Sequence, residues 1–158
     1  MTDFKRLVEV LTDGQVDFVV IGGVAVIAHG HTRLTEDLDI CYLRTPENME
    51  RLAVALEPLG PTLRGAPPGL PFHLDAATLK SGLNFTLESA AGDIDLLGEV
   101  TGVGGFAALI GDAIEREIYG RKVRIMSLAM LERSKRAAGR AKDLADLEAI
   151  REIKRRSS

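Results

Sequence analysis

Four aspartates in two short apolar segments have the residue types and spacing that favour chemistry. Asp37 and Asp39 alternate with apolar residues in a segment expected to be a β-strand, and Asp93 and Asp95 do the same in a later segment. Side chains of a strand alternate between its faces, so the carboxylates of each pair project to one side, about 6.6 Å apart. If the two strands are neighbours, Asp93 or Asp95 lies about 4.8 Å from the first pair. Hard oxygen ligands at this reach suit Mg²⁺.

A glycine pair could supply a phosphate site beside these acids. Gly22 and Gly23 end the apolar run 18–21 and open a short helix. Free backbone amides and the positive end of the helix dipole therefore point at any group that lies above this glycine corner. Arg33 lies in the polar loop before Asp37, and its planar guanidinium can donate hydrogen bonds to phosphate oxygens. Three carboxylates can hold two metal ions about 3.5 to 4 Å apart, which is the geometry used in phosphoryl transfer.

The elements that position these residues follow from periodicity, caps and turn residues. Apolar spacing and punctuation by glycine and proline predict alternating helices and strands, with a Pro- and Gly-rich loop over 60–69. The expected helices cover 3–12, 24–29, 46–58, 106–113, 127–138 and 142 onward, and the expected strands cover 16–21, 37–43, 83–87, 94–97 and a hairpin within 114–126.

Length and composition favour one cytoplasmic domain. The 158 residues are enough for a single core, expected over about 1–126 with C-terminal helices over about 127–156. No apolar run approaches a membrane span, no signal-type segment follows the first residues, and the one cysteine, Cys41, is expected in the core. The net charge of −3 and the absence of tryptophan argue against a long RNA groove. The basic cluster 151–156 is typical of a solvated helix end, with an RNA contact as the alternative.

Two charged residues lie on apolar stripes of the C-terminal helices. Lys135 continues the stripe of Leu128 and Leu131, and Asp146 shares one with Ile150. Burying either charge alone is costly, so we expect the two to meet each other or a ligand. A structural ion pair and a phosphate-binding Lys135 both stay open.

The spacing of these motifs resembles the nucleotidyltransferase superfamily. Gly22-Gly23 is followed after thirteen residues by Asp-x-Asp, which Thr-Arg-Leu-Thr-Glu precedes, and a hydrophobic-Asp-hydrophobic strand comes later. The compact bacterial and archaeal branch that includes AbiEii-type toxins looks similar, because it often ends in a helical segment like Lys135 followed by Arg-Ala-Lys-Asp-Leu-Ala-Asp-Leu over 140–147. The resemblance spans about 16–147.

The resemblance implies an α/β (α+β) fold: a small mixed β-sheet flanked by helices, with a C-terminal helical segment. It also implies Mg²⁺-dependent transfer of a nucleoside monophosphate from an NTP to an acceptor, through a two-metal site. Many members carry Gly-Ser at the corner, and Gly-Gly here removes one hydroxyl contact to phosphate. The implied metal-binding and catalytic residues are Asp37, Asp39 and Asp95, with Asp95 also as base, and the implied nucleotide contacts are Gly22, Gly23, Thr32, Arg33 and Lys135.

The acceptor is open, and two rival functions remain. RNA including tRNA, a protein hydroxyl and a small molecule are all compatible with the resemblance. The first rival is a catalytically inactive NTP- or partner-binding module, regulatory or related to toxin–antitoxin systems. The second is a dinucleotide-dependent enzyme, because the stretch from Gly102 to Ala107 matches the fingerprint G-x-G-x-x-G/A.

Overall fold

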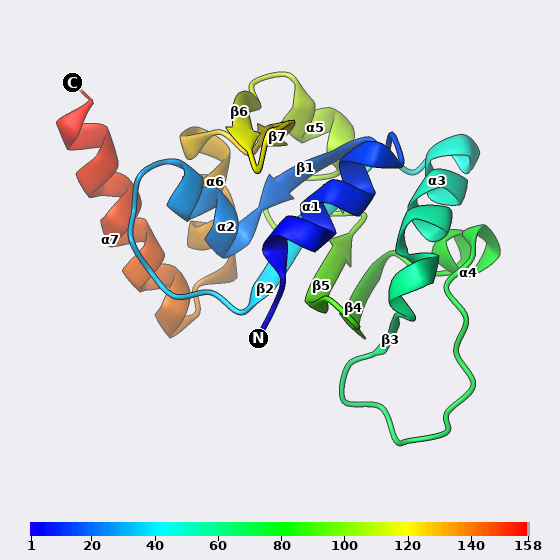
Figure 1. Cartoon of the computed structure of the whole chain (residues 1–158). Helices are drawn as coiled ribbons and strands as arrows, with labels where there is room; N and C mark the ends of the chain where they lie inside the picture. Colours follow the sequence, from blue (N-terminus) through cyan, green and yellow to red (C-terminus); the bar gives the residue numbers. More distant parts are fainter. Residues whose placement is uncertain (158) are drawn as a thin grey trace.

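The computed structural model describes residues 1–157, and a mixed seven-stranded sheet forms its centre (Figure 1). Its strands are β1 (Phe18–Ile21), β2 (Asp37–Tyr42), β3 (Thr62–Leu63), β4 (Asn84–Ser89), β5 (Gly92–Leu97), β6 (Ile114–Ile118) and β7 (Arg121–Ile125). Their order in the sheet is β3-β4-β5-β2-β1-β7-β6. The pairs β2–β5 and β1–β7 are parallel, and the other neighbours are antiparallel. The expected mixed sheet is confirmed.

Helices flank this sheet, and several of them begin or end at capping residues that the sequence marks. They are α1 (Phe4–Asp13), α2 (Gly22–Ala28), α3 (Pro46–Leu56), α4 (Ala76–Ser81), α5 (Phe106–Ile110), α6 (Leu128–Ala138) and α7 (Ala141–Arg156), with a 3₁₀ turn η1 (Glu57–Leu59) after α3. The Thr45 hydroxyl accepts a hydrogen bond from the Asn48 amide at the start of α3, and Ser127 does the same for Met130 in α6. Gly139 ends α6 in the left-handed conformation.

The two faces of the sheet differ in character. Leu38 and Ile40 of β2 are fully buried, and so are Ile94 and Leu96 of β5. α1 lies across the sheet and packs against α3, and α3 also packs against α4 (Figure 1). The aspartates alternate with these buried residues and therefore project from the opposite face.

The prediction of an irregular loop over 60–69 is partly wrong. Thr62 and Leu63 form β3, which pairs antiparallel with β4, and α4 was not expected at all. A two-residue strand is too short to give a periodic signal, and α4 is a six-residue helix started by Asp75. The helix expected over 106–113 ends earlier, at Ile110.

The C-terminal end of α7 carries the basic cluster 151–156. Arg151 and Arg155 are exposed and lie within 3.7 and 3.9 Å of the Glu148 carboxylate, as the solvated-helix interpretation predicts. Within residues 1–157, none of the helices combines the length and the apolar character that crossing a bilayer requires.

Candidate functional site

Parallel pairing of β2 with β5 brings the aspartates together. Asp37 lies opposite Asp93 in the register, and Asp39 lies opposite Asp95. One carboxylate oxygen from each of Asp37, Asp39 and Asp95 lies within 4.8 Å of the others, and all three residues are half-buried. Asp93 belongs to the same face, but its carboxylate is 3.4 Å from Nε of Arg64. The condition set by the sequence, that the two acidic strands are neighbours, is therefore met.

The acid cluster is electrostatically strained. Burial, followed by repulsion from Asp95, raises the pKa of Asp39 to about 7. The same two causes raise the pKa of Asp37. Asp39 Oδ1 is buried and has no hydrogen-bond partner in the described part of the chain. An orphaned carboxylate oxygen among other carboxylates is a suitable ligand for a hard cation, so the residues present fit Mg²⁺.

Both glycines of the corner lie against polar side chains. Gly22 has φ +66°, and a Cβ atom there would overlap the Asp39 carboxylate. A Cβ atom at Gly23 would lie 2.8 Å from Oγ1 of Thr35. The absence of side chains therefore lets β1 and α2 approach the acids closely. Thr35, which the sequence analysis did not select, lies at the corner, whereas Thr32 is exposed in the loop.

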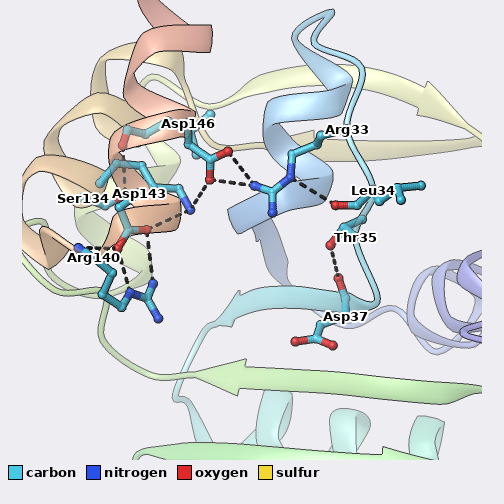
Figure 2. A network of polar contacts seen from close by, with 10 residues as sticks. Arg33, Leu34, Thr35, Asp37, Ser134, Arg140, Asp143 and Asp146 are labelled. Atoms are coloured by element: carbon cyan, nitrogen blue, oxygen red, sulfur yellow. Dashed lines mark hydrogen bonds and ion pairs between the residues drawn. The ribbon is translucent and has the colours of Figure 1, made fainter.

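An ionic network, with Lys135, Asp143 and Asp146 buried at its centre, joins the loop after α2 to α6 and α7 (Figure 2). Nζ of Lys135 lies 3.0 Å from Asp146 Oδ2 and 3.4 Å from Asp143 Oδ1. Nη1 of Arg33 donates to both oxygens of Asp146 at 2.6 Å, and Nε of Arg140 donates to Asp143 at 2.7 Å. Burial raises the pKa of Asp143, but hydrogen bonds from Arg140 outweigh that effect and lower it. The inward-facing Lys135 and Asp146 thus meet each other.

This network also borders two cavities beside the acids. A cavity of about 130 Å³ reaches from Gly22 and Asp39 to Lys135. A second one, of about 350 Å³, runs from Asp37 and Asp39 along the loop before β2. Four cationic side chains line this larger cavity: Arg33, Lys135, Arg140 and Lys142. Cations on one side and paired acids on the other suit a polyanion with a bound divalent ion. Arg140 and Lys142 belong to the C-terminal motif, but nothing in the sequence pattern assigns them to the site.

The glycine-rich segment after β5 has a packing role. A Cβ atom at Gly102 would overlap Ala137 of α6, and the backbones of Val100 and Gly104 pair with each other. The following helix, α5, leads to β6, which pairs antiparallel with β7 at the far edge of the sheet. A dinucleotide fingerprint requires a parallel strand after its helix, and this segment continues differently.

Solved structures share this architecture. A lincomycin-bound lincosamide antibiotic adenylyltransferase, LnuA, superposes with a TM-score of 0.62 at 15% identity, and the match covers 96% of each chain. The chain has a nucleotidyltransferase-like fold. ANT(2″)-Ia in complex with adenylyl-2″-tobramycin has the same fold with a TM-score of 0.59 at 18% identity, covering 93% of this chain and 84% of ANT(2″)-Ia.

A solution structure of ANT(2″)-Ia, described as an antibiotic-resistance factor, gives a TM-score of 0.59 at 18% identity and covers 93% of this chain and 80% of that one. No protein-family model and no curated protein matches the sequence. At these identities the likeness concerns the nucleotidyltransferase-like fold alone.

Proposed function

We propose that this chain is a Mg²⁺-dependent nucleotidyltransferase that moves a nucleoside monophosphate from an NTP to a hydroxyl of an acceptor. The observation that carries the proposal is the grouping of three carboxylate oxygens within 4.8 Å of one another. The grouping lies directly beside the Gly22 corner, on a fold shared with an adenylyltransferase. We treat residues 1–158 as one domain of this kind.

Asp37, Asp39 and Asp95 are the proposed metal ligands. Their combined negative charge and the orphaned Asp39 oxygen support this role. When bound, two Mg²⁺ ions would supply positive charge for the attacking and leaving oxygens of the transfer. The protein holds its three carboxylates on neighbouring strands, so the backbone already brings the proposed metal ligands together.

The larger cavity is the proposed site for the triphosphate. Gly22 and Gly23 would face the phosphates with their backbone amides. Arg33 and Lys135 are proposed phosphate contacts from the resemblance, and the cavity adds Arg140 and Lys142 to them. Thr32, also a proposed contact, is exposed and would need movement of its loop to reach the nucleotide.

The proposed reaction is a single displacement at the α-phosphorus. The acceptor hydroxyl oxygen forms a bond to the α-phosphorus, the bond to the β-phosphate oxygen breaks, and pyrophosphate leaves. The proton of the hydroxyl passes to a carboxylate oxygen of Asp95, which acts as general base. Asp95 is proposed for this role because it is half-buried and lies opposite Asp39 in the register.

A small molecule that carries a hydroxyl group is the acceptor class we favour. The names of the structural neighbours refer to lincomycin and tobramycin, both small molecules. tRNA and protein hydroxyls are the other candidate acceptors, and the turnover test below includes both. Assignment to the branch of AbiEii-type toxins rests on the C-terminal motif from Lys135 to Leu147.

An NTP-binding module without turnover is the second candidate. The observation that favours it is the ion pair between Nη2 of Arg64 and Asp95 at 2.8 Å, because it occupies the proposed base. Binding and turnover therefore need separate tests.

The binding test is thermal unfolding of the full chain with Mg²⁺ and each of four NTPs. We expect at least one NTP to raise the melting temperature of the wild type and Asp39→Asn to abolish the shift. The turnover test incubates the chain with NTPs labelled at the α-phosphate and with cell extract, hydroxylated small molecules or tRNA, using Asp37→Ala as the control. A labelled acceptor supports the transferase. Binding without any labelled product supports the second candidate. If no NTP shifts the melting temperature, both the transferase and the NTP-binding module are contradicted.

A further inference from the structure

Arg64 lies on the acid cluster, although no motif in the sequence points to it. Its Nη2 atom is 2.8 Å from Asp95 Oδ1, its Nε is 3.4 Å from Asp93 Oδ2, and its Nη1 is 3.8 Å from Asp37 Oδ2. Two of these three carboxylates are proposed metal ligands. The Arg64 side chain is 25% exposed, so the guanidinium is partly withdrawn from water.

The backbone of Arg64 is held by a hydrogen bond, while one N–H donor of its guanidinium has no acceptor. The Arg64 amide donates to Thr86 O at 2.9 Å directly after β3, which anchors the residue to β4. Nη2 donates to Leu87 O at 2.6 Å as well as to Asp95. Nε, however, is buried, and although it lies 3.4 Å from Asp93 Oδ2 it makes no hydrogen bond to any residue of 1–157. A guanidinium offers five N–H donors, and a permanent structural arginine normally satisfies its buried ones.

The segment that follows Arg64 is loosely surrounded. The next residue, Gly65, has φ +76° and begins the long connection to α4. Cβ atoms built at Gly65 and Gly69 would meet no described atom within 4 Å, so this connection borders open space. Release of the Arg64 side chain from the acids needs only rotamer changes, because its backbone can stay hydrogen-bonded to Thr86 of β4.

We propose that Arg64 is a built-in counter-ion that competes with the metal for Asp95 and Asp37. In the metal-free chain it holds the repelling carboxylates together, and it leaves them when a divalent ion binds. The physical reason is repulsion between the guanidinium and the metal ion, which would both contact Asp95. A divalent ion on the same carboxylates would lie a few ångströms from the guanidinium charge. This inference rests on the proposed metal site.

A positioning role for Arg64 makes the opposite prediction. If Arg64 stayed in place to orient Asp95 towards the metal, its removal would weaken metal binding. If Arg64 competes with the metal, its removal strengthens metal binding. The sign of the change in affinity therefore separates the two.

The test is calorimetric titration of Mg²⁺ and Mn²⁺ into the metal-free full chain, without nucleotide and at fixed pH and salt. We expect Arg64→Gln to tighten binding about tenfold, since one charge-assisted hydrogen bond no longer has to be broken. Arg121→Gln is the matched control, because Arg121 is 34% exposed and pairs with Asp13 and Glu9 away from the acids. It removes the same charge and should change the affinity by less than about twofold.

A second measurement follows Arg64 itself and does not depend on the stability of Arg64→Gln. The ¹⁵N–¹H resonance of Arg64 Nε, assigned by its loss in Arg64→Lys, should shift and exchange faster with water when Mg²⁺ is added. An Nε resonance unchanged at saturating Mg²⁺, or weaker or unchanged binding in Arg64→Gln, overturns the competition. Binding seen only in Arg64→Gln supports it. No binding in the wild type and in both Arg64 variants overturns the metal site, and this inference with it.

Discussion

The backbone of Gly22 lies directly against the carboxylate of Asp39. The two residues are neighbours across the β1–β2 pairing, in which Ile21 is opposite Asp39. Gly22 turns the chain out of β1 with φ +66°, and the space that a side chain would fill holds the Asp39 carboxylate. The corner and the acids are therefore one packed unit, and a change on the glycine side must displace the acid.

Gly22→Ala should both strain the backbone and displace Asp39, and comparison with a second glycine separates the two effects. We expect a loss of about 2 to 3 kcal/mol in the free energy of unfolding, from the positive φ and the overlap together. The rise in melting temperature with Mg²⁺ and NTP should disappear, because Asp39 moves. Gly60→Ala is the matched control: its φ is +58° and a Cβ there meets no described atom within 4 Å. It should cost about 1 kcal/mol and keep the ligand response. A ligand response retained in Gly22→Ala would contradict the packed unit.

Lys135→Met should lower both stability and NTP affinity. The substitution leaves Asp143 with Arg140 and Asp146 with Arg33, so we expect a cost of about 2 to 3 kcal/mol, below that of isolating a buried charge. NTP affinity, measured by calorimetry well below the melting temperature, should fall about tenfold if Lys135 also contacts phosphate. Lys154→Met is the control. It loses a surface pair with Glu132 and should cost less than about 1 kcal/mol. Unchanged NTP affinity in Lys135→Met would leave the lysine with a structural role only.

Asp143 should make stability depend on pH on the acid side. Its folded pKa is lowered below its ordinary value of 3.8, so it contributes stability above that pH and loses the contribution as pH falls through the folded pKa. We therefore expect Asp143→Asn to be about 2 kcal/mol less stable than the wild type at neutral pH. The difference should shrink as pH falls below about 4. Urea unfolding across this range measures it. Asp13→Asn, which removes an exposed pair with Arg121, should differ little at every pH. A difference that grows towards low pH would refute the assignment.

The half of the site between β1 and β2 could be predicted because its signals are local. Alternation places Asp37 and Asp39 on one face, and a glycine pair marks the strand end, so both can be inferred without long-range information. The register of β2 with β5 brings Asp95 to Asp39, whereas alternation along the strands alone left Asp93 and Asp95 as equal candidates.

Arg64 could not be predicted, because it depends on pairing between distant segments. It follows a two-residue strand within a proline- and glycine-rich stretch, and its partner strand begins twenty residues later at Asn84. The position of Thr35 beside Gly23 could not be predicted for a related reason, and Thr32 stays a prediction. Periodicity does not determine which residue of an irregular loop turns towards the glycine corner, so loop residues carry less information than strand residues.

Lys142 should contact the outer phosphates of a bound nucleotide. It is exposed at the start of α7 and lines the larger cavity with Arg140, beyond Asp37. With Mg²⁺ present, we expect affinity to fall in the order ATP, ADP, AMP. Lys142→Ala should weaken binding of a non-hydrolysable ATP analogue about three- to tenfold and that of AMP by less than twofold. Lys122→Ala is the control, since Lys122 is an exposed lysine on β7, beyond β1 from the acids. Calorimetric titrations of the three proteins with each nucleotide measure these effects. Equal weakening for AMP and the ATP analogue in Lys142→Ala would mean that Lys142 acts on the α-phosphate or only through net charge, and the triphosphate would then have to lie in the smaller cavity beside Gly22.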